Sequence, residues 1–242
     1  MLEWAAQRHE VFSKRWKVMM QREGDILALI NQAAKSGDTD EAVWRCFLAA
    51  HFGRTSSQDA HRIASSAMFL CAFGDSPRWT WECISSDPKG LQTWLSKNRS
   101  DLASLQFGNH RKFESPKPKL MWEVIKSFVD LAHEFEGPEL LIDLEQDEKG
   151  DPFDILYQRL RPLKRFGRTG RFDFLVLLSD LGLINAEPMK CYLQGATGPK
   201  DGAKLLWGDW TTGELDQAAA ELAAGLAVSP HVMEDALCCW QK

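Results

Sequence analysis

The sequence lacks any long apolar stretch. Among its 242 residues no hydrophobic run approaches the roughly 20 residues that cross a bilayer. The start of the chain also lacks the apolar core of a secretion signal, because polar residues interrupt it from Gln7 to Glu10. We therefore expect a cytoplasmic protein without membrane association.

Paired cysteines with metal-binding spacing are missing as well. The six cysteines include no C-x-x-C motif, and several stand among apolar residues at helical spacing. Free cysteine often packs as a small hydrophobic residue, so the pattern predicts reduced thiols rather than a zinc site. We expect neither a metal nor another cofactor.

No segment alternates apolar and polar residues over the length of a strand. Apolar residues instead recur at helical spacing behind helix-starting residues: Asp38 or Thr39, Asp151-Pro152 and Ser229-Pro230. The sequence predicts an all-α, multi-helix globular protein. Its expected parts are an N-terminal helical part (1–106), a functional loop or boundary (107–119) and a C-terminal helical part (120–242), unless these form one continuous domain.

The sequence contains four Phe-Gly pairs, which begin at Phe52, Phe73, Phe107 and Phe166. Glycine just past a helix end adopts the left-handed conformation at little cost, so we expect all four pairs to be helix C-caps. Three of them lead into cations: Arg54, the cluster Asn109-His110-Arg111-Lys112, and Arg168. Cations are favoured at helix C-termini in any case, which is the alternative explanation.

The chain is acidic in net charge, but positive charge is concentrated locally. The formal net charge is −5, which argues against a non-specific DNA coat. A basic run without an acid nevertheless contains Arg159, Arg161, Lys164, Arg165, Arg168 and Arg171. The segment that follows, Phe172 to Leu183, is apolar on nearly every side and predicts a buried helix.

A glycine-rich turn at 193–204 closes this region and enters another helix. Helix starts have unpaired N–H donors and a positive dipole end, so the turn suits a phosphate. It resembles a helix-hairpin-helix motif, although Gly195 and Gly198 stand two residues apart where the usual hairpin has one. The candidate DNA contacts are Gly195, Thr197, Gly198, Lys200 and Lys204.

A broader resemblance rests on FGNHRKFES, FGRTGRFDFL, YLQGATGPKDGAKLLW and EDALCCWQ. These motifs resemble the phage alpha-glutamyl/putrescinyl thymine pyrophosphorylase family, also described as amino acid:DNA transferases and distantly related to helix-hairpin-helix DNA glycosylases. The resemblance implies a glycosylase-like C-terminal part and a role in DNA hypermodification within an infected bacterium. The implied substrates are double-stranded DNA, whose 5-hydroxymethyluracil carries a (pyro)phosphate, and a free amino acid.

Several residues suit that chemistry. A phosphate leaving group needs cations, a role for Arg165, Arg168 and Arg171. Arginine matches an amino acid carboxylate, so Arg111 is the candidate for that contact. The attacking amine must lose a proton, and the candidate bases are His110, Asp173 and Asp235. Further substrate contacts are expected from Arg54, Asn109 and Lys112.

Two other functions remain open at this point. One is a helix-hairpin-helix DNA glycosylase or lyase, which needs an aspartate about twenty residues past its hairpin; the nearest here is Asp216, in an alanine-rich helix. The other is a non-catalytic, DNA-binding helical adaptor, in which Arg168 and Arg171 hold phosphates without reaction. In that case Asp173 and Asp235 have no catalytic role and are acids near helix starts, where the helix dipole favours them.

Overall fold

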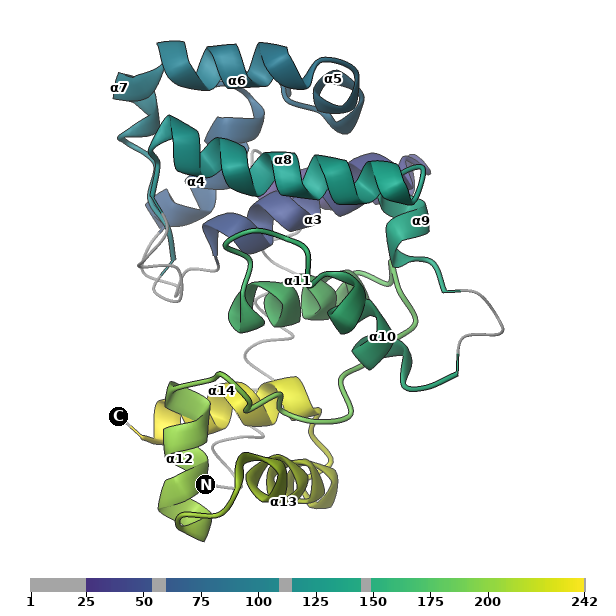
Figure 1. Ribbon diagram of the computed structural model, residues 1–242, viewed down its shortest axis with the longest axis vertical. Helices are drawn as coiled ribbons and strands as arrows, with labels where there is room; N and C mark the ends of the chain where they lie inside the picture. Colours follow the sequence, from purple (N-terminus) through teal and green to yellow (C-terminus); the bar gives the residue numbers. More distant parts are fainter. Residues whose placement is uncertain (1–24, 54–59, 109–114, 145–148, 242) are drawn as a thin grey trace. The chain divides into compact units, whose positions relative to one another are not determined.

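The computed structural model describes residues 25–53, 60–108, 115–144 and 149–241. Every regular element among them is a helix, from α2 to α14 (Figure 1), so the predicted all-α fold is confirmed. None of these described helices has the length and apolarity to span a membrane. Contacts divide the chain into two compact units.

The large unit comprises the described residues up to Lys149 together with Leu156–Asn185. Both sides of the 107–119 loop therefore belong to it. Its helices are α2 (Ile26–Lys35), α3 (Thr39–Phe52), α4 (Ala60–Leu70), α5 (Trp81–Ser86), α6 (Pro88–Lys97), α7 (Arg99–Leu102), α8 (Pro118–Glu134), α9 (Pro138–Ile142), the second half of α10 (Pro152–Arg159) and α11 (Arg168–Asp180). Helix α3 is its centre, because α2, α4, α5, α9 and α11 all pack against it.

Three predicted helix starts are confirmed. Helix α3 begins at Thr39 because Asp38 accepts a hydrogen bond from the Glu41 amide at 3.1 Å. Helix α10 begins at Pro152, where the Asp151 carboxylate accepts from the Asp154 amide at 2.7 Å. Helix α14 begins at Pro230 directly after Ser229. Side-chain capping and proline's fixed φ, both local effects, determine these boundaries.

The expectation that all four Phe-Gly pairs are helix C-caps is wrong for three of them. Only Phe52-Gly53 ends a helix, with Gly53 at φ +83°. Helix α4 already ends at Leu70, and Phe73 itself has a positive φ of 64°. Phe107-Gly108 lies in an irregular segment after α7, and Gly167 is the N-cap of α11.

The apolar segment predicted as a buried helix is buried. Phe172 and all five residues from Phe174 to Leu178 are inaccessible to solvent or nearly so. The helix α11 starts one turn earlier than predicted, at Arg168, because the Arg171 amide already bonds to the Gly167 carbonyl at 3.1 Å. It ends earlier than predicted, at Asp180, because Gly182 turns the chain with a φ of 71° and the Leu183 amide bonds back to the Leu178 carbonyl at 2.9 Å.

The small unit comprises Gly150–Ile155 and the described residues from Ala186 onward. Its helices α12 (Gly198–Trp207), α13 (Thr212–Gly225) and α14 surround a core that includes Leu193, Ala203, Leu215, Ala219, Met233 and Leu237. Helix α12 lies very close to α14, since a Cβ added at Gly202 would lie 2.0 Å from the Leu237 carbonyl oxygen. Glycine at 202 is therefore a packing requirement.

Candidate functional site

Inside the large unit we define an aromatic cluster of seven rings, which Trp44, Phe69 and Trp81 contact from outside. The Phe52 and Phe107 rings stack with centroids 5.0 Å apart, and Phe47 contacts Phe166 at 5.1 Å. Edge-to-face contacts connect Phe166 to Phe174 at 6.2 Å. Such pairs contribute about 0.5–1.5 kcal/mol each beyond their buried area. The members of the cluster are Phe47, His51, Phe52, Phe107, Phe128, Phe166 and Phe174.

The aromatic cluster brings together the three Phe-Gly pairs that precede cations. The Gly108 amide donates to the Phe52 carbonyl at 2.7 Å, so the chain leaves toward residues 54 and 109 from neighbouring points. Phe166 packs in the same cluster, one residue before the N-cap of α11. The predicted residues Arg54, Asn109, His110, Arg111 and Lys112 themselves lie outside the described residues, and their roles stay predictions.

The start of α11 carries two of the predicted arginines. Gly167 provides no side-chain cap, so the first amides of the helix keep their positive dipole end. The Arg168 guanidinium lies over the Phe172 ring at 4.6 Å. The Arg171 guanidinium lies over Tyr157 at 4.1 Å and donates to the Tyr157 carbonyl at 3.2 Å. Both side chains are half-buried and held in place by aromatic surfaces.

The other residues of this region differ from one another in role. Arg165 is exposed and adopts a positive φ of 54°. Asp173 is half-buried on α11 and, among the described residues, forms no ion pair with Arg168 or Arg171. Arg159 has a structural role, since it donates to the carbonyl of Leu141 in α9 at 2.9 Å and to that of Asp143, the C-cap of α9, at 2.6 Å.

His51 is a buried, titratable residue that the sequence analysis missed. It is 1% exposed in the last turn of α3, and its ring lies 5.2 Å from Phe52 and 5.4 Å from Phe107. The signal was available, because Phe47 precedes it by one helical turn and Phe52-Gly53 follows it directly. His51 thus lies beside the points where the chain leaves toward residues 54 and 109.

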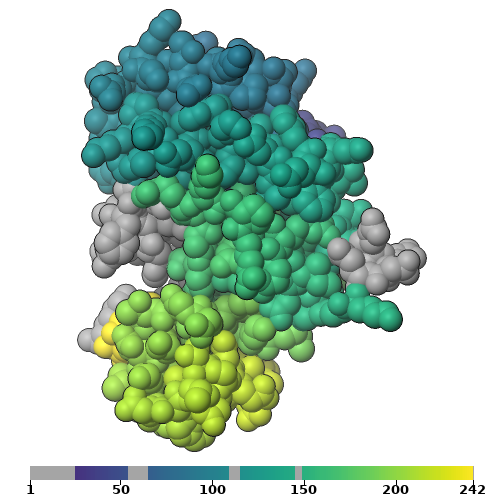
Figure 2. Space-filling view, in the orientation of Figure 1, coloured from purple at the N-terminus to yellow at the C-terminus, as the bar shows by residue number. Residues whose placement is uncertain are grey.

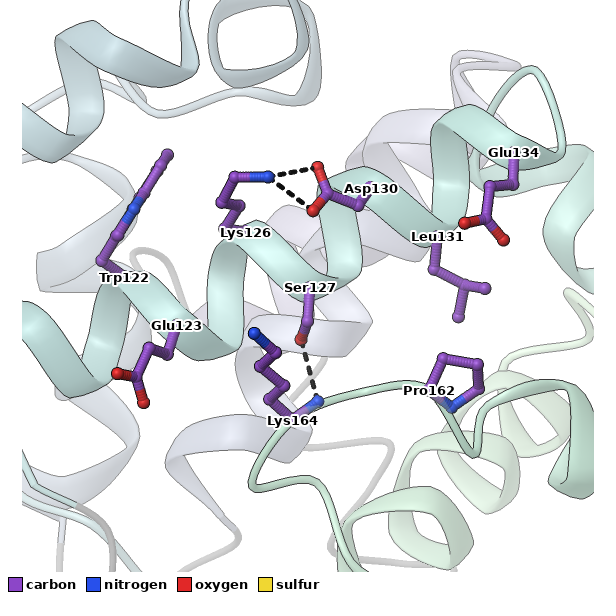
Figure 3. A pocket seen from close by; sticks show the side chains of 9 residues that line it. All are labelled: Trp122, Glu123, Lys126, Ser127, Asp130, Leu131, Glu134, Pro162 and Lys164. Atoms are coloured by element: carbon purple, nitrogen blue, oxygen red, sulfur yellow. Dashed lines mark hydrogen bonds and ion pairs between the residues drawn. The ribbon is translucent and has the colours of Figure 1, made fainter.

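A cavity of about 260 Å³ lies on another face of the large unit, between α8 and the turn after α10 (Figure 3). The Ser127 hydroxyl accepts from the Lys164 amide at 3.0 Å and so holds the turn against α8. Lys126 pairs with Asp130 at 2.6 Å on the rim. Because Glu123, Glu134 and Lys164 also line it, the cavity has mixed charge and suits a polar, zwitterionic solute better than a polyanion.

The glycine-rich turn in the small unit forms a helix start. The Ala196 amide bonds to the Leu193 carbonyl at 3.0 Å, and Gly195 has a φ of 79°, a conformation that favours glycine. Thr197 is the N-cap of α12 but makes no capping bond with its side chain. Pro199 has no N–H, so Gly198 and Lys200 supply the amides of the first turn.

Two of the five predicted DNA contacts have other partners. A Cβ added at Gly198 would lie 2.8 Å from the Cys238 sulfur, so this glycine allows α12 to approach α14. Lys204 pairs with Asp209 at 2.7 Å, a hydrogen bond that raises the pKa of the Lys204 ammonium. Gly195 and Thr197 are exposed, and Lys200 is half-buried. All five remain predicted DNA contacts.

Two acids of the small unit contact neighbouring groups. Asp216 on α13 accepts the Leu193 amide at 2.9 Å and so anchors the segment that leads into the turn. This structural role does not favour the glycosylase alternative. The predicted base Asp235 lies on α14, where its carboxylate accepts from the Cys239 thiol at 3.9 Å. Asp235 therefore belongs to the small unit, whereas Arg168, Arg171 and Asp173 belong to the large one.

The described residues contain no group of three His, Cys, Asp or Glu side chains arranged to hold a metal ion. All six cysteines lie in the described part of the chain as free thiols.

Comparison with known proteins places the chain in a family. Neither the curated proteins nor the solved structures gave a match. The family model described as "Alpha-glutamyl/putrescinyl thymine pyrophosphorylase clade 3" matches residues 7–242, which include both the aromatic cluster and the glycine-rich turn. The chain therefore belongs to the alpha-glutamyl/putrescinyl thymine pyrophosphorylase family, clade 3.

Proposed function

We propose that the protein is a transferase that attaches an amino acid nitrogen to a modified uracil in DNA. The family name indicates a pyrophosphorylase-type activity in thymine hypermodification. One observation carries the finer proposal: the uncapped start of α11 presents Arg168 and Arg171 beside an aromatic cluster that also holds the Phe52-Gly53 and Phe107-Gly108 pairs. This arrangement supports binding of a phosphate-bearing methylene group by the large unit.

The proposed reaction is a displacement at the 5-methylene carbon of the base. The amine nitrogen forms a bond to this carbon, and the bond between the carbon and the (pyro)phosphate oxygen breaks. The leaving group departs with the electron pair, so negative charge develops on it while the amine loses a proton. Two arginines and a helix N-terminus would stabilise the leaving anion, because preorganised positive charge binds it best as it forms.

The proton acceptor and the amino acid contacts are assigned on sequence grounds. His110, Asp173 and Asp235 are the candidate bases, and Asp173 shares α11 with the two arginines. Arg111 would bind the amino acid carboxylate, with Asn109, Lys112, Arg54 and Arg165 as further substrate contacts. The glycine-rich turn of the small unit would hold the DNA backbone through its amides and Lys200.

The direct test is turnover of a defined substrate. Duplex DNA containing phosphorylated or pyrophosphorylated 5-hydroxymethyluracil is incubated with the protein and a mixture of amino acids. The DNA is then digested to nucleosides, which are identified by mass spectrometry. We expect an amino acid adduct of the thymine analogue together with released phosphate or pyrophosphate. Release of free base, leaving an abasic site, would instead establish the glycosylase alternative.

Arg168→Ala is the variant that tests the leaving-group role. We expect kcat to fall about 30- to 1000-fold, because each charge-assisted contact to a developing anion stabilises the transition state by about 2–4 kcal/mol. Arg161→Ala is the matched control, since Arg161 is an exposed arginine of the same basic run. Thermal melting of both variants separates lost catalysis from the loss of the Arg168–Phe172 contact. Near-normal turnover by a folded Arg168→Ala protein would remove this residue from the mechanism.

A further inference from the structure

Two adjoining cavities lie at the start of α8. Neither is lined by Arg168 or Arg171. One, of about 400 Å³, is lined by residues of α6, α7 and α8, among them Gln92, Arg99, Lys119 and Trp122. The other, of about 510 Å³, is lined by Arg99, Ala103 and the segment 116–120. Because they share Arg99, Pro118 and Lys119, they form one continuous depression, which we name the cationic groove.

All the charge lining the cationic groove is positive. Arg99, Lys117 and Lys119 are exposed there, and among the described residues no aspartate or glutamate lines either cavity. None of the three cations forms an ion pair within the described part of the chain. A purely cationic depression is unexpected on a protein with a net charge of −5, in which acids outnumber bases.

The backbone adds to this positive potential. Helix α8 is 17 residues long and starts at Pro118, and its N-cap Lys117 makes no side-chain capping bond. The first turn of α8 contains no acid either, so the positive end of its dipole adds to the potential of the groove, where an anion would be stabilised. Figure 1 shows the start of α8 beside α7, and on the face in Figure 2 the blue and teal segments from α6 to α8 form one surface.

Trp122 lies between the cationic groove and the mixed-charge cavity. Its half-buried indole lines the cationic groove and also the mixed-charge cavity of Figure 3, where Glu123, Asp130 and Glu134 are found. Arg99 and Lys119 line only the groove side of this boundary.

We propose that the cationic groove binds backbone phosphates of the duplex DNA on which the protein acts. Three cations, Arg99 on α7 and Lys117 and Lys119 at the start of α8, suit a polyanion better than a single phosphate, because each can neutralise a different phosphate group. Such contacts position the DNA without reading its sequence. The proposal rests on the proposed function in one respect, that the substrate is DNA, and adds a second contact surface distinct from the α11 arginines and the glycine-rich turn.

The test compares two triple variants with equal loss of charge. The groove variant is Arg99→Ala/Lys117→Ala/Lys119→Ala, and the control is Lys35→Ala/Lys89→Ala/Lys149→Ala, which removes three exposed lysines elsewhere on the large unit. Affinity for an unmodified, fluorescent duplex is measured by anisotropy between about 50 and 200 mM salt. We expect the groove variant to bind at least about tenfold more weakly at low salt, with the salt slope reduced by about 2–3, as loss of three phosphate contacts requires. The control should match the wild type.

A second measurement does not depend on the stability of a variant. Wild-type protein is treated with an amine acetylating reagent in the presence and absence of the duplex, and the modified lysines are identified by mass spectrometry. DNA should protect Lys117 and Lys119 but not Lys35 or Lys89. Equal labelling of Lys117 and Lys119 with and without DNA would contradict the proposal that the groove binds DNA. Equal loss of affinity in both triple variants would contradict it as well.

These outcomes separate the groove from the proposed function. Wild-type protein that binds no DNA refutes both, whereas wild-type binding that the groove variant retains refutes the groove alone. Equal binding to a polyglutamate chain would indicate a surface for acidic proteins and also overturn the proposal. A groove variant that binds DNA weakly, in a protein without transferase activity, would support the groove and refute the transferase.

Discussion

Glu41 is an acid buried inside the large unit, and it connects three helices. It is 5% exposed, its Oε1 accepts from Arg45 Nε at 2.6 Å, and its Oε2 accepts from the Trp81 amide at 2.5 Å. Arg45 in turn donates to the Leu29 carbonyl at 2.5 Å. Burial raises the pKa of the Glu41 carboxyl, although the Trp81 amide and Arg45 oppose this. The network therefore fixes α2 and α5 against α3.

Glu41→Ala should cost about 3–5 kcal/mol in the free energy of unfolding. The reason is that Arg45 would keep a buried charge without its partner, and the Trp81 amide would lose its acceptor. Urea denaturation measures the loss, with Glu82→Ala as the control because Glu82 is an exposed acid on neighbouring α5. A loss below about 1 kcal/mol would mean that the network contributes little net stability.

At the scale of the element, Asp154 connects α10 to the segment before the glycine-rich turn. Lys190 donates to its carboxylate at 2.8 Å, and the Tyr192 hydroxyl donates to its other oxygen. Burial raises the pKa of Asp154, but the hydrogen bonds from Lys190 and Tyr192 outweigh it and the net shift is downward. A carboxyl with a lowered folded-state pKa stabilises the protein only while it is ionised.

The stability that Asp154 contributes should therefore be lost in acid. It is complete above the ordinary carboxyl pKa of about 3.9 and disappears as the pH falls through the lower, folded-state value. Asp154→Asn should lower stability at pH 7 by about 1 kcal/mol or less, since the side chain is 35% exposed. Urea denaturation from about pH 3 to pH 7 should show this difference narrowing in acid. The exposed Glu187→Gln should show no such trend, and a difference that stays constant with pH would contradict the role of ionised Asp154.

Helix starts with a capping side chain or a proline in the first turn were the most predictable boundaries, because local chemistry determines them. Asp38, Asp151 and Ser229-Pro230 all start helices where the sequence predicts. The Phe-Gly pairs were not predictable in this way. Their phenylalanines pack against partners that are far away in the sequence, as when Phe107 stacks on Phe52. Rules for helix ends that use only neighbouring residues cannot predict such packing.

The candidate site was predictable in composition but not in arrangement. The sequence singled out three Phe-Gly pairs with following cations, yet only the fold brings Phe52, Phe107 and Phe166 into one aromatic cluster. The sequence patterns did not indicate His51, Trp122 or the cationic groove. The lining of this groove comes from α6, α7 and the start of α8, which only the fold brings together. The packing reason for Gly198, the closeness of the Cys238 sulfur, also follows from the fold and not from the local sequence.

At the scale of the whole molecule, the proposed roles divide between the two units. The large unit carries the arginines of α11 and the cationic groove, and the small unit carries the glycine-rich turn. The division has a kinetic consequence. Residues that bind only the DNA backbone stabilise the ground state and the transition state equally, so they affect KM, whereas residues that bind the leaving group affect kcat.

Lys200 provides the test of this division, because it lies in the first turn of α12 without the packing role of Gly198. Lys200→Ala should weaken DNA binding equally for all sequences and lower the salt slope by about 1, as loss of a single phosphate contact requires. It should raise KM for modified DNA and leave kcat within about twofold, the reverse of Arg168→Ala. In the double variant the two effects on kcat/KM should multiply, since one residue holds the backbone and the other the leaving group. The exposed Lys149→Ala controls for the lost charge. A fall in kcat for Lys200→Ala, or affinity equal to that of the control, would show that the turn does not bind DNA in this way.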